Sequence, residues 1–220
     1  MRTECFTIHL TFGENNVDNL INNYVEAEKL GYVCIVDFNV ITQSFRCDEY
    51  NKILNNASFN TCDGSSLAFL YNIKNKTNYH SYNGPEIFKK FIENDKIIQL
   101  IVGADPKDFD LLKDRLAVSS HLMNLPLPTL NVDQFDYDCI SKQINILKPK
   151  IIWILLGAPK QEKFISKIIP MVETGLFFGA GAALNFYLGK IKNTSFSILG
   201  LRFIWLNRLI KEPIKQSKRI

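Results

Sequence analysis

The segment Gly157-Ala158-Pro159-Lys160-Gln161-Glu162 has the residue types needed to hold an anionic ligand. It follows an apolar, strand-like run and opens a helical pattern. Gly157 permits a tight turn and Pro159 suits the first helical position, so free N–H groups and the positive end of the helix dipole face outward. Gln161 offers a donor and an acceptor to a sugar or uracil edge. An ordinary strand-to-helix turn, with Glu162 merely favourable in the first helical turn, explains the pattern equally well.

Asp63-Gly64 is a second candidate for chemistry, because it closes a short strand just before a helical pattern begins at Ser65. A carboxylate at this position can cap the following helix by accepting from its first N–H groups. At the mouth of a ligand crevice it can instead be a general base that takes a proton from an acceptor hydroxyl. The pattern alone does not choose between the two roles.

Gly179-Ala180-Gly181 begins like the dinucleotide-binding fingerprint. It lacks the third small residue, and no acidic residue stands about twenty positions further on. A tight turn with close helix packing is therefore favoured. A dinucleotide-dependent oxidoreductase is kept as a rival.

Two acidic pairs, Asp108-Phe109-Asp110 and Asp136-Tyr137-Asp138, have the spacing of the DxD motif of metal-dependent sugar transferases. Both fall in the first turn of a predicted helix, where the dipole favours acids. His9, His80 and His121 lack metal-ligand spacing. We therefore predict no metal site and no cofactor.

The C-terminal segment 197–220 combines large apolar side chains with cations, the composition of an interfacial amphipathic helix. It holds six Lys and Arg residues against Glu212 alone, so its net charge is +5, whereas residues 1–196 sum to −1. A helix packed on the sheet and a contact between copies are the alternatives. Nucleic acid is a less suitable partner for so apolar a tail. Its main apolar and basic residues are Phe196, Leu199, Arg202, Phe203, Ile204, Trp205, Arg208, Leu209, Ile210 and Lys211.

The whole chain fits one domain with an appendage: 220 residues, 46% hydrophobic and 22% charged. The N-terminus has no secretory pattern, and no apolar run reaches the roughly 18–20 residues that span a bilayer. The five cysteines form no CxxC pair, which favours reduced, buried thiols over zinc or disulfides. We expect a cytoplasmic protein.

The element order predicted from the sequence alternates strand and helix. Such alternation predicts an α/β fold of Rossmann-like type, a mostly parallel sheet with helices on both faces, over residues 1–196. The predicted strands are 5–12, 32–38, one closing at 62–64, 96–102, 127–132, 151–156 and 175–178. The predicted helices are 17–30, 48–56, 65–73, 84–92, 105–118, 136–147, 159–169 and 181–188.

Ligands of such sheets bind beyond the carboxyl ends of the strands. The residues that follow strand-like runs are therefore candidates for contact with substrate: Asp37 with the nearby Asn39, Asp63, Gly103, Gly157 and Gly179.

At this point the motifs resemble the WecG/TagA/CpsF glycosyltransferase family. The resemblance rests on the ordered series Asp63-Gly64, Gly84-Pro85, Gly157-Ala158-Pro159-Lys160-Gln161-Glu162, Gly179-Ala180-Gly181 and Trp205-Leu206-Asn207-Arg208-Leu209 with Glu212-Pro213. It covers the chain from about Tyr32 to the end.

The resemblance implies a bacterial enzyme that moves a sugar, an N-acetylhexosamine or a hexose, from a UDP-sugar to a polyprenyl-diphosphate-linked acceptor. Such enzymes serve teichoic acid, common antigen or capsule synthesis, and they look metal-independent and inverting. The implied setting is the inner face of the plasma membrane, where the basic tail meets the anionic surface. A homo-oligomer is compatible with this setting.

The resemblance also assigns roles to residues. Asp63 matches the family's proposed catalytic base, Gln161 lies near the donor, and Arg208 could face the diphosphate. Gly84, Gly103, Pro159, Lys160, Glu162, Gly181 and Asn185 complete the expected substrate-binding set.

The sequence departs from the family pattern at several of these places. Asn185 stands where the family has Asp, Ile204 where it has Glu, and Ser81 where it has Arg; Asp37 replaces an expected Asn, and Thr194-Ser195 replace Ala-Pro. These departures keep open a rival from another class, a non-catalytic protein of the same fold that binds a nucleotide sugar or a lipid phosphate.

Overall fold

A computed structural model describes residues 2–5, 7–191, 197–198 and 201–202. Arg208, Ile204 and most of the predicted tail helix lie outside these residues, and the division into a body of 1–196 and an appendage of 197–220 stays a prediction. Where the tail is described, at Ser197–Ile198 and Leu201–Arg202, it forms two strands and not the predicted helix. Within the described part, no helix combines the length and apolar character needed to cross a bilayer.

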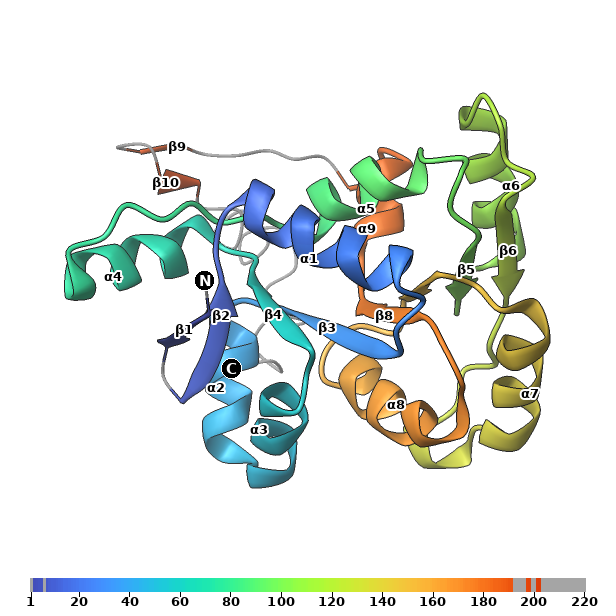
Figure 1. Ribbon diagram of the computed structural model, residues 1–220, viewed down its shortest axis with the longest axis horizontal. Helices are drawn as coiled ribbons and strands as arrows, with labels where there is room; N and C mark the ends of the chain where they lie inside the picture. The colour runs from blue at the N-terminus through green and yellow to red at the C-terminus, as the bar shows by residue number, and fades with distance from the viewer. Residues whose placement is uncertain (1, 6, 192–196, 199–200, 203–220) are drawn as a thin grey trace.

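The centre of the molecule is one eight-stranded sheet in the order β1-β2-β4-β3-β8-β7-β5-β6 (Figure 1). Seven strands run parallel, and only β1 pairs antiparallel, with β2. The predicted α/β class is thus confirmed. The strands are β1 Arg2–Cys5, β2 Ile8–Thr11, β3 Gly31–Val36, β4 Phe59–Cys62, β5 Gln99–Val102, β6 Leu122–Leu125, β7 Ile151–Ile154 and β8 Leu176–Gly179, with β9 Ser197–Ile198 and β10 Leu201–Arg202 as a separate pair.

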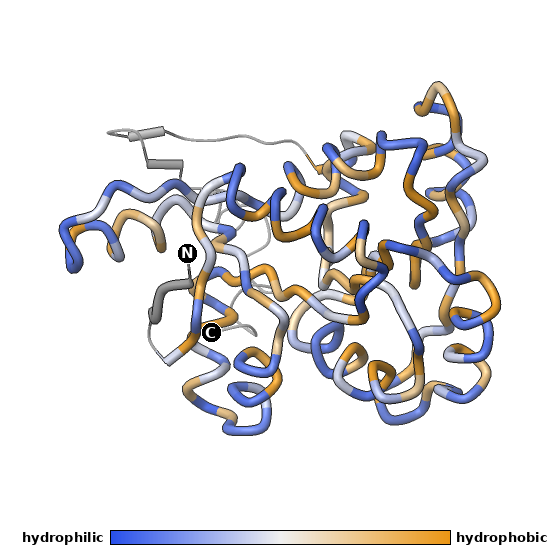
Figure 2. Tube along the Cα trace, viewed as in Figure 1, coloured by the Kyte–Doolittle hydropathy of each residue, from blue (hydrophilic) through white to orange (hydrophobic). Residues whose placement is uncertain are grey.

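Helices cover both faces of the sheet, as predicted, because successive strand side chains point to opposite sides. Along β7, Ile152 and Ile154 join one buried cluster, while Ile151 and Trp153 join the other. Figure 2 shows the central strands as mostly hydrophobic along their length. One face is packed by α2 Phe38–Arg46, α3 Asp48–Asn55, α7 Tyr137–Leu147 and α8 Lys160–Ile168, with α4 Ser65–Asn75 at its edge; the other by α1 Glu14–Glu26, α5 Gly84–Ile92, α6 Pro106–Arg115 and α9 Ala183–Tyr187.

Two predicted strands are wrong, and one helix was not predicted. The single strand predicted over 5–12 is a hairpin, because Thr7 adopts a positive φ of 68° between β1 and β2. The strand predicted over 127–132 lies instead at Leu122–Leu125, since proline-rich 126–130 cannot pair along β5. Helix α2 was not predicted; Asp37 caps it by accepting from the Val40 N–H at 2.9 Å.

A buried polar contact joins β5 to its neighbour β7. Gln99 is fully buried, its Oε1 accepts from Trp153 Nε1 at 2.8 Å, and its Nε2 donates to the Phe91 carbonyl at 2.7 Å. Trp153 in turn packs against Phe88 and Phe178, with ring centroids 5.0 Å and 4.7 Å away. Gln99 therefore satisfies groups that have no access to water.

We expect Gln99→Leu to lower the free energy of unfolding by roughly 2–5 kcal/mol, because two buried polar groups lose their partner. Urea denaturation monitored by circular dichroism measures the change. The same substitution at exposed Gln143 on α7 is the control, and it should stay within about 0.5 kcal/mol of wild type. Equal effects at the two positions would contradict the structural role of Gln99.

Candidate active site

Asp63 lies just beyond the carboxyl end of β4, beside the end of β3. Its N–H donates to the Val36 carbonyl at 2.9 Å, which continues the β3–β4 ladder. Its carboxylate Oδ1 accepts from the Gly84 N–H at 2.7 Å, at the first residue of α5. Asp63 thus joins a strand end to the start of a helix twenty-one residues further along the chain.

This geometry gives the Asp63 carboxylate a long-range partner that neither interpretation from the sequence included. The N-cap of helix α4 is Gly64, which has no side chain to cap the helix. The close approach of α5 also explains Gly84. A Cβ there would lie 3.0 Å from Ile35 Cδ1 and 3.7 Å from the Asp63 carboxylate.

The turn between β7 and α8 has the predicted open character. Gly157 has a φ of 74°, which favours glycine, and nothing lies within 4 Å of the position a Cβ would take. Pro159 is the N-cap of α8 and not its first residue as predicted, so the helix starts one residue later. Within the described residues, the N–H groups of Ala158 and Lys160 have no hydrogen-bond partner.

The side chain of Gln161 ties this turn to the end of β8. Only 4% of Gln161 is exposed. Its Oε1 accepts from the Gly157 N–H at 3.1 Å, and its Nε2 donates to the Gly179 carbonyl at 2.9 Å. The amide expected to face a ligand is therefore engaged inside the protein, and a donor-binding role for Gln161 stays a prediction.

Glu162 is fully buried beside Gln161. Its Oε1 accepts from Gln161 Nε2 at 2.8 Å, whereas its Oε2 has no hydrogen-bond partner. Burial raises the pKa of the Glu162 carboxyl to about 7; the contact with Gln161 opposes this rise, and the negative Asp37 adds to it. The Tyr50 hydroxyl is a neighbour of this carboxylate. Burial raises the pKa of the Cys34 thiol, and the negative charge of Glu162 raises it further. Within the described part of the chain, Glu162 is thus a buried acid without a cation to neutralise it.

Gly179 and Gly181 are needed for close packing, which confirms the favoured interpretation of this motif. A Cβ at Gly179 would meet Gln161 Nε2 at 2.8 Å and Glu162 Oε1 at 3.1 Å. The N–H groups of Ala180 and Gly181 both donate to the Ile154 carbonyl, at 2.9 Å and 3.2 Å. These two N–H groups are therefore engaged with the end of β7.

The remaining predicted residues follow strands at the same edge of the sheet, and they differ in burial and in their contacts. Asp37 and Asn39 are half-buried at the start of α2, and Asn185 is half-buried in α9. Gly103 follows β5, with a φ of 87°. Lys160 points its Nζ toward the Leu130 carbonyl and lies 5.2 Å from the centre of the Phe135 ring, so its cation faces away from the Gly157 turn.

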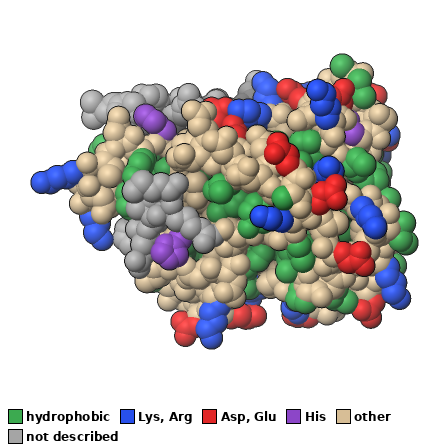
Figure 3. Space-filling view, viewed as in Figure 1, with side chains coloured by type: hydrophobic (Ala, Val, Ile, Leu, Met, Phe, Trp, Pro, Cys, Tyr) green, Lys and Arg blue, Asp and Glu red, His purple; other side chains and the backbone are tan. Residues whose placement is uncertain are grey.

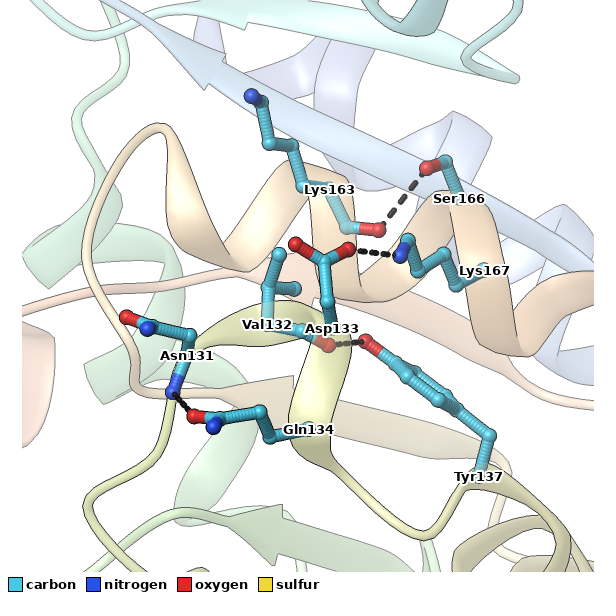
Figure 4. A network of polar contacts seen from close by, with 8 residues as sticks. All are labelled: Asn131, Val132, Asp133, Gln134, Tyr137, Lys163, Ser166 and Lys167. Atoms are coloured by element: carbon cyan, nitrogen blue, oxygen red, sulfur yellow. Dashed lines mark hydrogen bonds and ion pairs between the residues drawn. The ribbon is translucent and has the colours of Figure 1, made fainter.

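The segment 131–137 packs beside helix α8 and contacts it (Figure 4). Tyr137 donates to the Val132 carbonyl at 2.6 Å, and Asp133 pairs with Lys167 of α8. In Figure 4 the Lys163 side chain extends away from this pair. Lys163 therefore takes no part in the Asp133–Lys167 ion pair.

A hollow of about 190 Å³ lies beside the Gly157 turn and was not predicted. It is lined by Gln43 and Arg46 of α2, Cys47, Tyr50, Pro159 and Lys163. The sequence offered a signal for Lys163, because it follows Lys160 at helical spacing. It offered none for Arg46, which belongs to the helix that was not predicted. This hollow brings positive charge close to the N-terminus of α8.

The acidic DxD-like pairs occupy helix starts, as favoured. Asp136 caps α7 by accepting from the Cys139 N–H at 2.9 Å, and Asp108 pairs with Lys190. Asp110 pairs with Lys113 at 2.9 Å. Among the described residues, no group of three or more His, Cys, Asp or Glu side chains could hold a metal ion.

The fold defines an α/β protein of the doubly wound class, in which ligands generally bind beyond the carboxyl ends of the parallel strands. Residues 7–220 match the model of the family described as "Glycosyl transferase WecG/TagA/CpsF family". The chain belongs to this family of glycosyltransferases.

Curated relatives are similar over nearly the whole chain. One from Bacillus subtilis (strain 168) is 23% identical over 229 aligned positions, covering 100% of this chain and 88% of the relative. One from Bacillus spizizenii (strain ATCC 23059 / NRRL B-14472 / W23) is 18% identical, covering 93% and 80%. Both are named N-acetylglucosaminyldiphosphoundecaprenol N-acetyl-beta-D-mannosaminyltransferase.

The buried Glu162 predicts a pH dependence of stability. Because its folded pKa of about 7 exceeds the ordinary 4.5, the folded state binds the proton more tightly. Its contribution is fully present below about pH 4.5, and it is lost as pH rises through 7. The shift corresponds to roughly 3 kcal/mol.

Glu162→Gln should remove this dependence, because glutamine imitates the protonated acid in shape and charge. We expect similar unfolding free energies for variant and wild type near pH 4.5, and a more stable variant at pH 8. Denaturant unfolding at several pH values measures both. Parallel pH profiles of the two proteins would contradict the assignment.

Proposed function

We propose that this chain transfers an N-acetylhexosamine from a UDP-sugar to a polyprenyl-diphosphate-linked N-acetylglucosamine, with inversion at the anomeric carbon. The observation that carries the proposal is family membership over residues 7–220, with Asp63 held at the carboxyl edge of the sheet. The two relatives named for such a transfer, similar over most of their length, support the acceptor class.

Asp63 is proposed as the general base. Its carboxylate takes the proton of an acceptor hydroxyl, and that oxygen attacks the anomeric carbon as the bond to UDP breaks. The Gly84 N–H at 2.7 Å fixes the carboxylate, which supports this role because proton transfer needs a defined geometry. UDP departs with the electron pair of the broken bond.

The departing diphosphate needs positive partners. The unpartnered N–H groups of Ala158 and Lys160 at the start of α8 supply donors, and Arg46 and Lys163 supply charge in the adjoining hollow. Fixed donors of this kind stabilise charge that develops in a transition state. Arg208, outside the described residues, is proposed to add a further cation from the tail.

The non-catalytic alternative keeps one supporting observation, the replacement of expected family residues by Asn185 and Ser81. Asn185 is half-buried in α9, where an amide replaces a carboxylate. A protein of this kind would bind UDP and show no acceptor-dependent release of UDP.

Asp63→Asn should lower kcat by about 10²–10⁴, because the amide cannot accept the proton. The asparagine Oδ1 can still accept from the Gly84 N–H, so the fold should be retained. Release of UDP from a panel of UDP-hexoses and UDP-N-acetylhexosamines, with a polyprenyl-diphosphate-N-acetylglucosamine acceptor, measures the change.

Asp105→Asn is the matched control for this substitution. Asp105 caps α6 at the same edge of the sheet by accepting from the Lys107 N–H at 2.9 Å, and asparagine preserves this contact. The control should keep wild-type kcat. A loss below tenfold in Asp63→Asn would remove Asp63 from the base role, and no release by wild type with any donor would favour the binding protein.

Removal of residues 197–220 tests the proposed membrane contact of the tail. We expect loss of transfer to the polyprenyl-linked acceptor with a retained cooperative unfolding transition, because the body has its own two buried clusters. The transfer assay and a thermal melt measure these two properties. Undiminished transfer by the shortened chain would refute the contact.

A further inference from the structure

Helix α4 presents an apolar stripe to solvent on the side opposite its buried face. Leu67, Ala68 and Tyr71 are buried, whereas Phe69, Leu70 and Ile73 are 43%, 47% and 61% exposed. The spacing of 69, 70 and 73 places these side chains on one helical face. A surface helix that is apolar on both sides is unusual, because one side normally carries polar residues.

The stripe is held rigidly. Tyr71 packs against Phe12 with ring centroids 5.0 Å apart, which anchors the buried side of the helix. The turn after α4 is closed by Asn72, whose Nδ2 donates to the Tyr79 carbonyl and whose Oδ1 accepts from the Tyr79 N–H, both at 2.8 Å. The exposed side chains therefore belong to a preformed surface.

The charge around this stripe has one sign. Residues 65–85 contain Lys74, Lys76 and His80 and no Asp or Glu. In Figure 3 the left end of the molecule, where Figure 1 places α4, shows basic side chains and no acidic ones on the visible face. An apolar stripe on a segment whose charged residues are all basic complements an anionic lipid surface.

The position of α4 relates this surface to the site. The helix begins two residues after Asp63, and β10, the last described part of the basic tail 197–220, packs on it. An acceptor anchored in lipid must reach Asp63 from the bilayer. A surface on α4 would bring the membrane to the start of the same helix.

We infer that Phe69, Leu70 and Ile73, with Lys74 and Lys76, form a lipid-docking surface on the body of the protein for an anionic bilayer. This contact is additional to the one proposed for the tail. The choice of a lipid partner rests on the proposed function, whereas the exposed stripe and its one-signed charge are independent of it.

Binding of the full chain to sedimented vesicles of phosphatidylglycerol and phosphatidylethanolamine tests the inference. The double substitution Phe69→Ser with Ile73→Ser should lower the partition coefficient at least tenfold, since burial of even one such side chain is worth about that much. Ile146→Glu is the control, because Ile146 is 80% exposed on α7 at the opposite end of the molecule (Figure 1), and it should stay within twofold of wild type.

Several outcomes would overturn the inference. Unchanged vesicle binding of the double variant would do so, as would wild-type binding to phosphatidylcholine vesicles as tight as to anionic ones. A wild-type dimer that the double substitution converts to a monomer in size-exclusion chromatography would instead assign the stripe to a contact between copies. An unchanged melting temperature of the double variant excludes unfolding as the cause of lost binding.

Transfer to a short, water-soluble diphosphate acceptor separates this inference from the proposed function. The double variant should keep that activity while losing transfer to vesicle-borne acceptor. Absence of both activities in wild type would refute the proposed function, and the vesicle assay would still decide whether α4 binds lipid.

Discussion

The buried amide of Gln161 holds the turn after β7 against the end of β8, and the arrangement of the site depends on this contact. It joins the Gly157 N–H to the Gly179 carbonyl, and it also donates to Glu162. A buried amide with every polar group paired resists displacement, because breaking one bond leaves another group unpaired. The glycines at 157, 179 and 181 follow from this contact, because larger residues would strain the turn or collide with the amide.

The same edge of the sheet is fixed independently on its other side by Asp63 and Gly84. Their hydrogen bond brings the start of α5 to the end of β4, across twenty-one residues of chain. Between these two contacts lie β3 and β8, the neighbouring strands at which the N-terminal and C-terminal halves of the sheet meet. Two attachments built from backbone groups and half-buried or buried side chains therefore lie on either side of one strand pair. Such a scaffold suits a reaction in which positioning and fixed donors provide most of the rate.

Buried acidity is the unusual electrostatic feature of this site. Glu162 lies behind the Gly157 turn, with no cation beside it among the described residues, and its raised pKa follows from burial more than from its neighbours. Partial protonation of Glu162 near neutral pH lowers the negative charge behind the helix start that is proposed to receive a diphosphate. Positive groups lie on the accessible side, where Arg46 and Lys163 line the adjoining hollow. The accessible side of α8 therefore carries the positive charge that an anionic ligand needs, and the acid lies on the buried side.

The sequence alone determined the α/β class, most helices and strands, and the family, because alternating apolar periods and glycine-containing turns are local signals. It also placed Asp63, Gly157 and Gly179 at strand ends. It could not reveal that Asp63 binds the Gly84 N–H, or that Gln161 faces inward, because both contacts join segments distant in sequence. Helix α2 and the position of β6 were missed where pairing and packing prevailed over local pattern. The tertiary structure alone decided which side chains on α4 are buried and which remain exposed. Both faces of this helix are apolar, so the side that packs on the sheet cannot be read from the sequence.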